Sequence, residues 1–149
     1  MQIISLDGKV LVEVTSLLNL KAAGYNLSFA NLAEESVAGA DFTDADLSCS
    51  DLSGAELTGC ILVRANLAFV KAPYADLCGV HGVQSDWFSA DLRGIDFRRA
   101  RLAYASFKNC NLEGADLRGA DISGADFRGC KLNGCRFDDC VTTGTSFSS

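Results

Sequence analysis

The sequence contains one proline, one histidine and one tryptophan, and it has no long uninterrupted apolar run. Since no stretch approaches about 18 apolar residues, we expect no membrane span. The N-terminus MQIISLDGKV has neither a basic start nor an apolar run of signal length, so we expect a cytoplasmic protein with reduced thiols. The lone histidine, His81, has no serine or cysteine partner at a useful spacing, which argues against nucleophilic catalysis.

A strong positive charge is also missing. The 149 residues carry a net charge of −6, whereas proteins that bind nucleic acid directly use a positive field. The length and the 48% hydrophobic content suit one soluble domain. We therefore expect a domain that binds neither nucleic acid nor a membrane.

What is abundant is a repeat of five residues, seen most clearly in GADLRGADISGADFRGC at residues 114–130. From Leu27 to Phe147, the residues whose numbers end in 2 or 7 are large and apolar at 22 of 25 positions. Alanine or cysteine usually lies two residues earlier, and aspartate or asparagine often lies between the two. A helix would need apolar residues about every 3.6 positions and a strand every second one, so neither explains this period.

Residues two apart point to the same side of an extended backbone. Each unit therefore predicts a short β-like segment with one inward face, followed by a turn in which glycine is frequent. A chain that turns the same way every five residues winds into a solenoid with its Leu, Phe, Ala and Cys inside. The aspartates then point outward, and we interpret them as a solvated face.

Units such as GADLR, GADIS and SFANLA resemble the pentapeptide-repeat family, whose pattern is A(D/N)LXX, over residues 25–149. The resemblance implies an all-β fold, a right-handed quadrilateral β-helix of about six coils with four pentapeptides in each. At about 4.8 Å per coil the rod would be about 30 Å long. Residues 20 apart should stack, as in the outward column Asn26, Asp46, Asn66, Asp86, Ser106, Asp126 and Ser146.

The first 24 residues lie outside this frame and are predicted to form an N-terminal cap. The segment IISLDGKVLVEV indicates a β-hairpin about an Asp7-Gly8 turn. Residues 15–24 are predicted to form a short helix, with Thr15 or Ser16 as its N-cap and Gly24 just past its end. The cap would cover the open edge of the first coil.

One coil has unusual inward residues. Trp87 falls in the same coil as Ala72 and Gly82, so the largest inward side chain would offset the two smallest. Pro73, the only proline, lies in this coil and is expected to remove one donor from the hydrogen bonds between coils. We expect this coil to be the least regular.

The seven cysteines do not predict a metal site. Cys130, Cys135 and Cys140 would lie on different sides of the coil, whereas structural zinc sites usually draw cysteines from tight CxxC turns. We interpret them as small buried apolar residues. Cys110 and Cys130 stack closely enough for a disulfide, which a reducing compartment disfavours. We predict no catalytic, cofactor-binding or metal-ligating residues.

A candidate protein-binding surface comprises outward residues on one side of the rod: Ile61, Val63, His81, Val83 and Tyr104. Scattered outward apolar residues are normal, so four on one side over two or three coils indicate either a binding site or positions that merely tolerate apolar groups. The sequence therefore favours a non-enzymatic protein-binding scaffold whose partner it does not name.

The resemblance also implies an alternative. Some members of the family resemble duplex DNA in shape and charge and bind DNA gyrase, protecting it from quinolones. The counterpart here would be the acidic stack Glu56, Asp76, Asp96 and Asp116. However, Arg98 and Arg118 follow two of these aspartates by two residues and would cancel much of their field.

The last coil, around residues 127–147, is expected to expose an open edge with unpaired backbone groups. Two copies meeting end to end about a two-fold axis would extend the core through Phe137 and Phe147. The sequence therefore also suggests a homodimer formed through this end.

Overall fold

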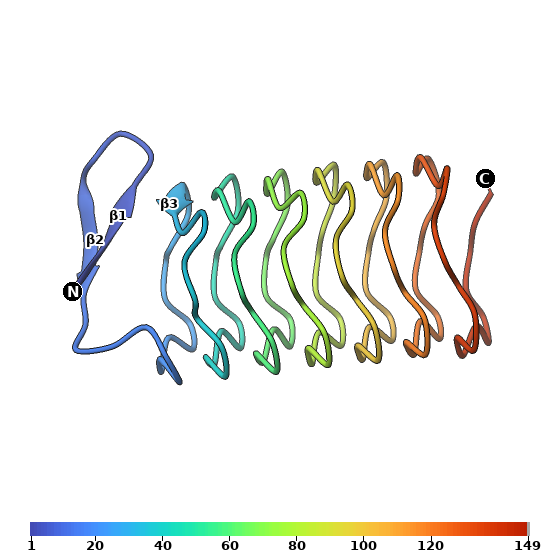
Figure 1. Ribbon diagram of the computed structural model, residues 1–149, viewed down its shortest axis with the longest axis horizontal. Helices are drawn as coiled ribbons and strands as arrows, with labels where there is room; N and C mark the ends of the chain where they lie inside the picture. Colours follow the sequence, from blue (N-terminus) through green and yellow to red (C-terminus); the bar gives the residue numbers. More distant parts are fainter. Residues whose placement is uncertain (149) are drawn as a thin grey trace.

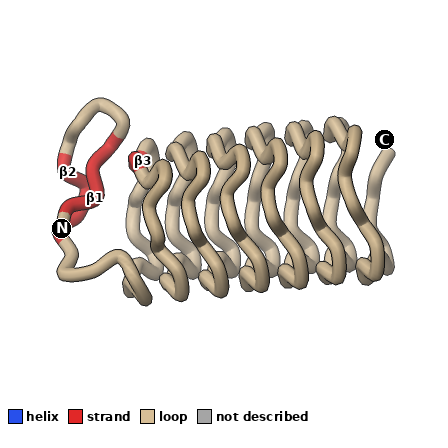
Figure 2. Tube along the Cα trace, viewed as in Figure 1, coloured by secondary structure: helices blue, strands red, loops and turns tan. Residues whose placement is uncertain are grey.

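The computed structural model describes residues 1–148 and is all-β. A hairpin of β1 (Gln2–Ser5) and β2 (Val10–Glu13) stands at one end of a stack of coils, and β3 (Ala30–Asn31) lies near the start of that stack (Figure 1). The other coils are drawn as loops and turns because their extended segments are very short (Figure 2). Nothing in residues 1–148 forms a helix of the length and apolar character needed to cross a membrane.

The coils repeat every 20 residues. Single parallel bridges join residues 20 apart, from the pair Lys21 and Asp41 to the pair Asp126 and Ser146. The predicted column that contains Asn26 and Ser146 is confirmed, because each of its members bridges to the next. Four pentapeptides therefore make one coil, and about six coils make the rod, as the family resemblance implied.

Hydrogen bonds between coils use most of the backbone, and the unit 46–50 is representative. The N–H of Asp46 donates to the preceding coil, and those of Leu47 and Cys49 donate to the following coil. The N–H of Ser50 closes the turn on the carbonyl of Leu47. These four bonds are 2.8–3.2 Å long, so only one N–H of a regular unit inside the stack lacks a backbone acceptor.

The aspartates supply the acceptor for that fifth N–H. In the same unit, the N–H of Ser48 donates to Oδ1 of Asp46 at 2.9 Å. This is an Asx-type bond, in which a short side chain caps the backbone two residues on. The capped amides belong to Ser28, Ala33, Thr43, Ser48, Ser53, Ala68, Cys78, Phe88, Arg93, Arg98, Glu113, Arg118, Ser123 and Arg128. The outward aspartates therefore also cap the backbone, a role that the sequence analysis did not predict.

The core runs along the axis of the rod. The large inward residues from Leu27 to Phe127 are almost completely excluded from solvent, and the alanines two residues before them are buried with them. Exposure increases in the last coil, where Leu132 and Phe137 are half-buried and the side chain of Phe147 is 42% exposed. The predicted inward set is thus confirmed, except at the end of the stack.

In the coil around Trp87, the large indole ring fills the space left by the small residues Ala72 and Gly82, as the sequence suggested. The indole ring stacks on Phe107 at a centroid distance of 5.9 Å and meets Phe97 edge-on at 5.3 Å. Its Nε1–H donates to Oγ of Ser85 at 2.7 Å, and that hydroxyl donates to the carbonyl of Gly82 at 2.6 Å. The buried polar groups are therefore satisfied.

The expected irregularity of this coil is wrong, because bridges continue through it without a break. Pro73 occupies the one position whose N–H has no backbone acceptor in the regular unit, so proline removes no bond between coils there. Its carbonyl still accepts from the N–H of Gly54 at 3.0 Å. Lys71 stands where other units carry the capping aspartate or asparagine. No cap is needed there, because Pro73, two residues on, has no N–H.

The hairpin about the Asp7-Gly8 turn is confirmed, with Ile3 of β1 opposite Val12 of β2. On its other side β1 pairs antiparallel with β3, where Ile4 faces Asn31. The order of the sheet is therefore β2-β1-β3. Because β1 takes up hydrogen-bonding groups at the edge of the first coil, the hairpin acts as a cap.

The predicted helix over residues 15–24 is wrong, since the chain there already follows the coil. Leu17, Leu20 and Ala22 are buried in the core, and the N–H of Asn19 donates to the carbonyl of Ala38 at 3.0 Å. Coil geometry thus begins near residue 17, and the cap is shorter than residues 1–24. Bonds to the next coil satisfy these backbone groups, whereas a short isolated helix would be marginal.

The capping bond predicts a difference between two substitutions in one column. Asn66 caps the N–H of Ala68 at 3.0 Å, whereas Ser106 makes no bond to the N–H of Lys108. We expect Asn66→Ala to lower the free energy of unfolding by about 1 kcal/mol. Ser106→Ala should change it by less than about 0.5 kcal/mol. Urea denaturation followed by circular dichroism measures both, and equal losses would contradict a capping role.

Candidate functional site

The five predicted surface residues Ile61, Val63, His81, Val83 and Tyr104 lie on one side of the rod, and we call this surface the apolar face. Ile61 bridges to His81, and His81 bridges to Arg101 in the next coil. The N–H of Arg64, next to Val63, donates to the carbonyl of Val83. Three successive coils therefore bring these residues together.

The apolar face has a shallow centre and one prominent aromatic group. Ile61, Val63, His81 and Val83 are half-buried, whereas Tyr104 is 67% exposed. The ring of Tyr104 extends over the next coil, where a Cβ on Gly124 would come within 2.6 Å of its ring atoms. Glycine at position 124 thus gives the tyrosine a flat surface on which to lie.

Arginines border the apolar face. Arg64 binds Asp44 with both donors, at 2.7 Å from Nε and 2.9 Å from Nη2. Arg101 follows Ile61 and His81 in the same stacked column, and it has no carboxylate of residues 1–148 within 4.0 Å. An apolar centre with a charged rim is the composition found at protein interfaces.

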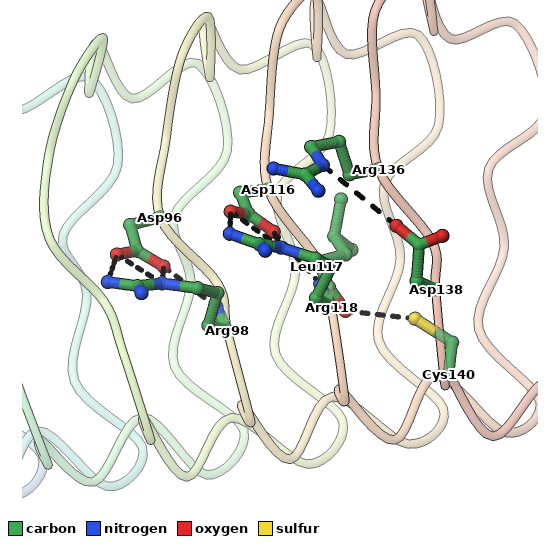
Figure 3. Close-up of polar contacts among 8 residues, drawn as sticks. All are labelled: Asp96, Arg98, Asp116, Leu117, Arg118, Arg136, Asp138 and Cys140. Carbon is green, nitrogen blue, oxygen red and sulfur yellow. Dashed lines mark hydrogen bonds and ion pairs between the residues drawn. The ribbon is translucent and has the colours of Figure 1, made fainter.

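The acidic stack is also brought together, since Glu56, Asp76, Asp96 and Asp116 bridge in succession. Figure 3 shows that arginine side chains lie against its second half. Arg98 binds Asp96, and Arg118 binds Asp116, each through Nη2 at 2.6 Å. In the last coil the order of charges is reversed, with Arg136 stacked beyond Asp116 and 3.9 Å from Asp138. Half of the stack is therefore neutralised.

These ion pairs change the acidity of the carboxylates. The hydrogen bonds from Arg118 lower the pKa of Asp116 to about 2. Burial raises the pKa of Asp96, but the bonds from Arg98 outweigh it and hold that pKa below its ordinary value. Both aspartates also cap the N–H of their arginine, which joins backbone and side chain in one unit.

The acidic segment of residues 34–56 encircles the rod. Asp41, Asp46, Asp51 and Glu56 each belong to a different stacked column, because their bridge partners are Ile61, Asn66, Lys71 and Asp76. Two carboxylates of the segment have cationic partners, Asp44 with Arg64 and Asp51 with Lys71 at 3.5 Å. The charge thus forms no continuous acidic stripe.

The cysteines bind backbone carbonyls. Sγ of Cys60, Cys110, Cys130, Cys135 and Cys140 each donates to a carbonyl 23 residues earlier, and Figure 3 shows the bond from Cys140 to Leu117 at 2.9 Å. All seven thiols are free. Burial raises the pKa of Cys60 to about 11, so its thiol stays protonated and able to donate. Within residues 1–148 no group of three or more potential ligands is placed to hold a metal ion.

The aromatic column of the core ends at the predicted dimer end. Phe127 stacks on Phe107 at 4.7 Å and on Phe147 at 5.4 Å, measured between ring centroids. Phe137 meets Phe147 edge-on at 5.6 Å. The partly exposed ring of Phe147 therefore continues the core to the last described coil.

The sequence did not reveal a hollow of about 500 Å³ between the hairpin and the coils. Leu6, Lys9 and Leu11 line it from the hairpin, and Asn26 and Phe29 line it from the first coil. Its walls depend on how β1 lies against β3. No local pattern in the sequence could have predicted this hollow, because that packing joins segments far apart in the chain.

Two family models match the chain. A model of a pentapeptide repeat region matches residues 83–149, and a model of pentapeptide repeats in eight copies matches residues 26–62. The chain belongs to the pentapeptide-repeat family. No curated protein matches the sequence at a significant level.

Solved pentapeptide-repeat proteins resemble the chain in fold. Rfr23 from the cyanobacterium Cyanothece 51142 is 28% identical over 64% of this chain, with a TM-score of 0.43, and this chain spans 63% of its length. HetL from Nostoc sp. strain PCC 7120, involved in heterocyst differentiation regulation, is 23% identical over 88% of this chain and 82% of its own, with a TM-score of 0.48. QnrB1, a plasmid-mediated fluoroquinolone resistance protein, is 21% identical over 89% of this chain and 84% of its own, with a TM-score of 0.47.

The ion pairs of the acidic stack predict a dependence of stability on pH. The pKa of Asp116 is about 2 in the folded protein and about 3.9 in an unfolded chain, so its ionised form stabilises the fold above the unfolded value. This contribution is lost as the pH falls toward 2. Asp116→Asn keeps a capping oxygen but cannot ionise, so its stability should fall less than that of the parent between pH 5 and pH 2.

Urea denaturation at pH 7, 5, 3 and 2 measures this effect. Asp76→Asn is the matched control, because Asp76 caps Cys78 but has no arginine two residues on. If the two variants depend on pH in the same way, the pair of Asp116 with Arg118 is not the cause.

Proposed function

We propose that this pentapeptide-repeat protein is a non-enzymatic scaffold that binds another protein through the apolar face. The observation that supports this most strongly is the grouping of Ile61, Val63, Val83 and Tyr104 on three successive coils. Apolar residues at outward positions of a regular coil add nothing to the core. Contiguous apolar groups with a polar rim instead suit a protein partner.

The shape of the face supports the same proposal. Backbone bonds to both neighbouring coils hold each segment, so the face is ordered before a partner arrives and little conformational entropy is lost on binding. Tyr104 presents a large amphipathic ring, the kind of side chain that often contributes most of the binding energy at interfaces.

The alternative role as a mimic of DNA receives less support from the charges. Asp96 and Asp116 are paired with arginine, and the acidic residues of the segment 34–56 lie around the rod. A mimic of duplex DNA needs regularly spaced, uncompensated negative charges along one surface. We therefore favour the scaffold.

Binding through the apolar face is tested by capture from a lysate of the source cell. Val83→Glu places a charge in the centre of the face and should abolish capture of the partner. Ala68→Glu places the same charge on another side of the rod, at the equivalent outward position two residues after Asn66, and should leave capture unchanged. Identical proteins captured in equal amounts by both variants would contradict the proposal.

We also propose that two copies associate end to end through the last coil. Phe147 is 42% exposed although it belongs to the core column, and Phe137 beside it is half-buried. A second copy about a two-fold axis would cover both rings and close the assembly. We expect light scattering at micromolar concentration to give the mass of two chains for the parent and of one chain for Phe147→Asp. The mass of one chain for the parent would refute this association.

A further inference from the structure

The capping bond is interrupted on the apolar face. At the positions where other units carry a capping aspartate or asparagine, three successive coils carry Ile61, His81 and Arg101. None of these side chains caps the backbone two residues on. The N–H groups of Val63, Val83 and Ala103 consequently have no acceptor within residues 1–148.

The interruption is bounded on both sides. In the preceding coil Asp41 caps Thr43 at 3.0 Å, and in the following coil Asp121 caps Ser123 at 3.0 Å. Since the backbone repeats from coil to coil, the three uncapped N–H groups point to the places that a carboxylate oxygen occupies in the capped coils. Neighbouring donors lie about 4.8 Å apart, the spacing of adjacent strands.

No other column of the described residues has such a row. The next longest run of uncapped amides has two members, Ala38 and Thr58, behind Ser36 and Glu56. Lys71 also stands at a capping position, but the residue two positions on is Pro73, which has no N–H. Among the amides at capping positions, the longest stacked row without a cap therefore coincides with the apolar face.

The side chains along this row carry one positive charge, that of Arg101, and the carboxylates of Asp41 and Asp121 stand at its two ends. Arg101 has no carboxylate of residues 1–148 within 4.0 Å, so it can pair with an anion from outside. The three donors together span about 10 Å, which is longer than a single carboxylate can reach. A charged acceptor also makes a stronger hydrogen bond with an N–H than a neutral one does.

We propose that the apolar face binds an acidic, extended segment of a partner protein, whose carboxylates accept from the N–H groups of Val63, Val83 and Ala103. The partner's carboxylates thus take the places of the missing aspartates, and its apolar groups contact Ile61 and Tyr104. This proposal rests on the proposed function of the face as a protein-binding surface and names the chemistry of the partner.

The probe is a hexapeptide of alternating aspartate and leucine with blocked termini. It is compared with the same peptide carrying asparagine in place of aspartate. We expect the aspartate peptide to bind at least about tenfold more tightly. In ¹H–¹⁵N spectra of the full chain, the amide resonances of Val63, Val83 and Ala103 should move downfield on binding. Equal binding of the two peptides, no binding, or unmoved amide resonances would each overturn the proposal.

A matched pair of variants separates the missing cap from general attraction of charge. His81→Asn supplies a capping amide to the N–H of Val83, as Asn66 does for Ala68. His81→Gln carries the same group on a longer side chain that does not make the Asx bond. We expect His81→Asn to weaken binding of the aspartate peptide about tenfold and His81→Gln to weaken it less than about twofold. Equal affinities for the two variants would overturn the proposal.

The two proposals fail in different ways. If the peptide experiments fail while Val83→Glu still loses its captured partner, the face binds proteins but not through the uncapped donors. If the peptide results are as expected while Val83→Glu captures the same proteins as Ala68→Glu, the carboxylate site stands and the proposed function is wrong.

Discussion

The fold depends on hydrogen bonds between coils that satisfy a backbone with almost no long strands. In each unit of five residues, three N–H groups reach neighbouring coils and one closes the turn. The fifth would face solvent without a partner, and the aspartate or asparagine of the repeat supplies its acceptor, as Asp46 does for Ser48. The repeat pattern thus meets two needs at once, an apolar core and an acceptor for the fifth N–H of most units.

This constraint determines what the surface can vary. Inward positions must fill the rod at high density, so Trp87 is tolerated because Gly82 lies in the same coil. Outward positions are restricted only where a cap is needed. A column of outward residues can therefore be acidic, paired with arginine or apolar while the bridges between coils continue.

The two ends of the rod are treated differently. At the first coil, β1 pairs with β3 and takes up part of the open edge. At the last described coil, Phe147 continues the aromatic column and is partly exposed. Along the length of the rod, Asp96 and Asp116 each do two things. Each carboxylate caps the backbone N–H of the arginine two residues on, and each binds the guanidinium group of that arginine.

The period, the inward residues and the grouping of the apolar face could be predicted from the sequence because each follows from spacing in one frame. The hairpin could be predicted because an Asp-Gly turn lies between two short apolar segments. The sequence also predicted a helix at residues 15–24, because Ser16 is a typical N-cap and Gly24 a typical residue just past a helix. That helix does not form, because Leu17 and Leu20 are buried in the core and this segment bonds to the next coil. The capping role of the aspartates and the uncapped amides of Val63 and Val83 required the tertiary structure. An N–H can be said to lack an acceptor only when every neighbouring coil is known, and the stacking decides which coils are neighbours.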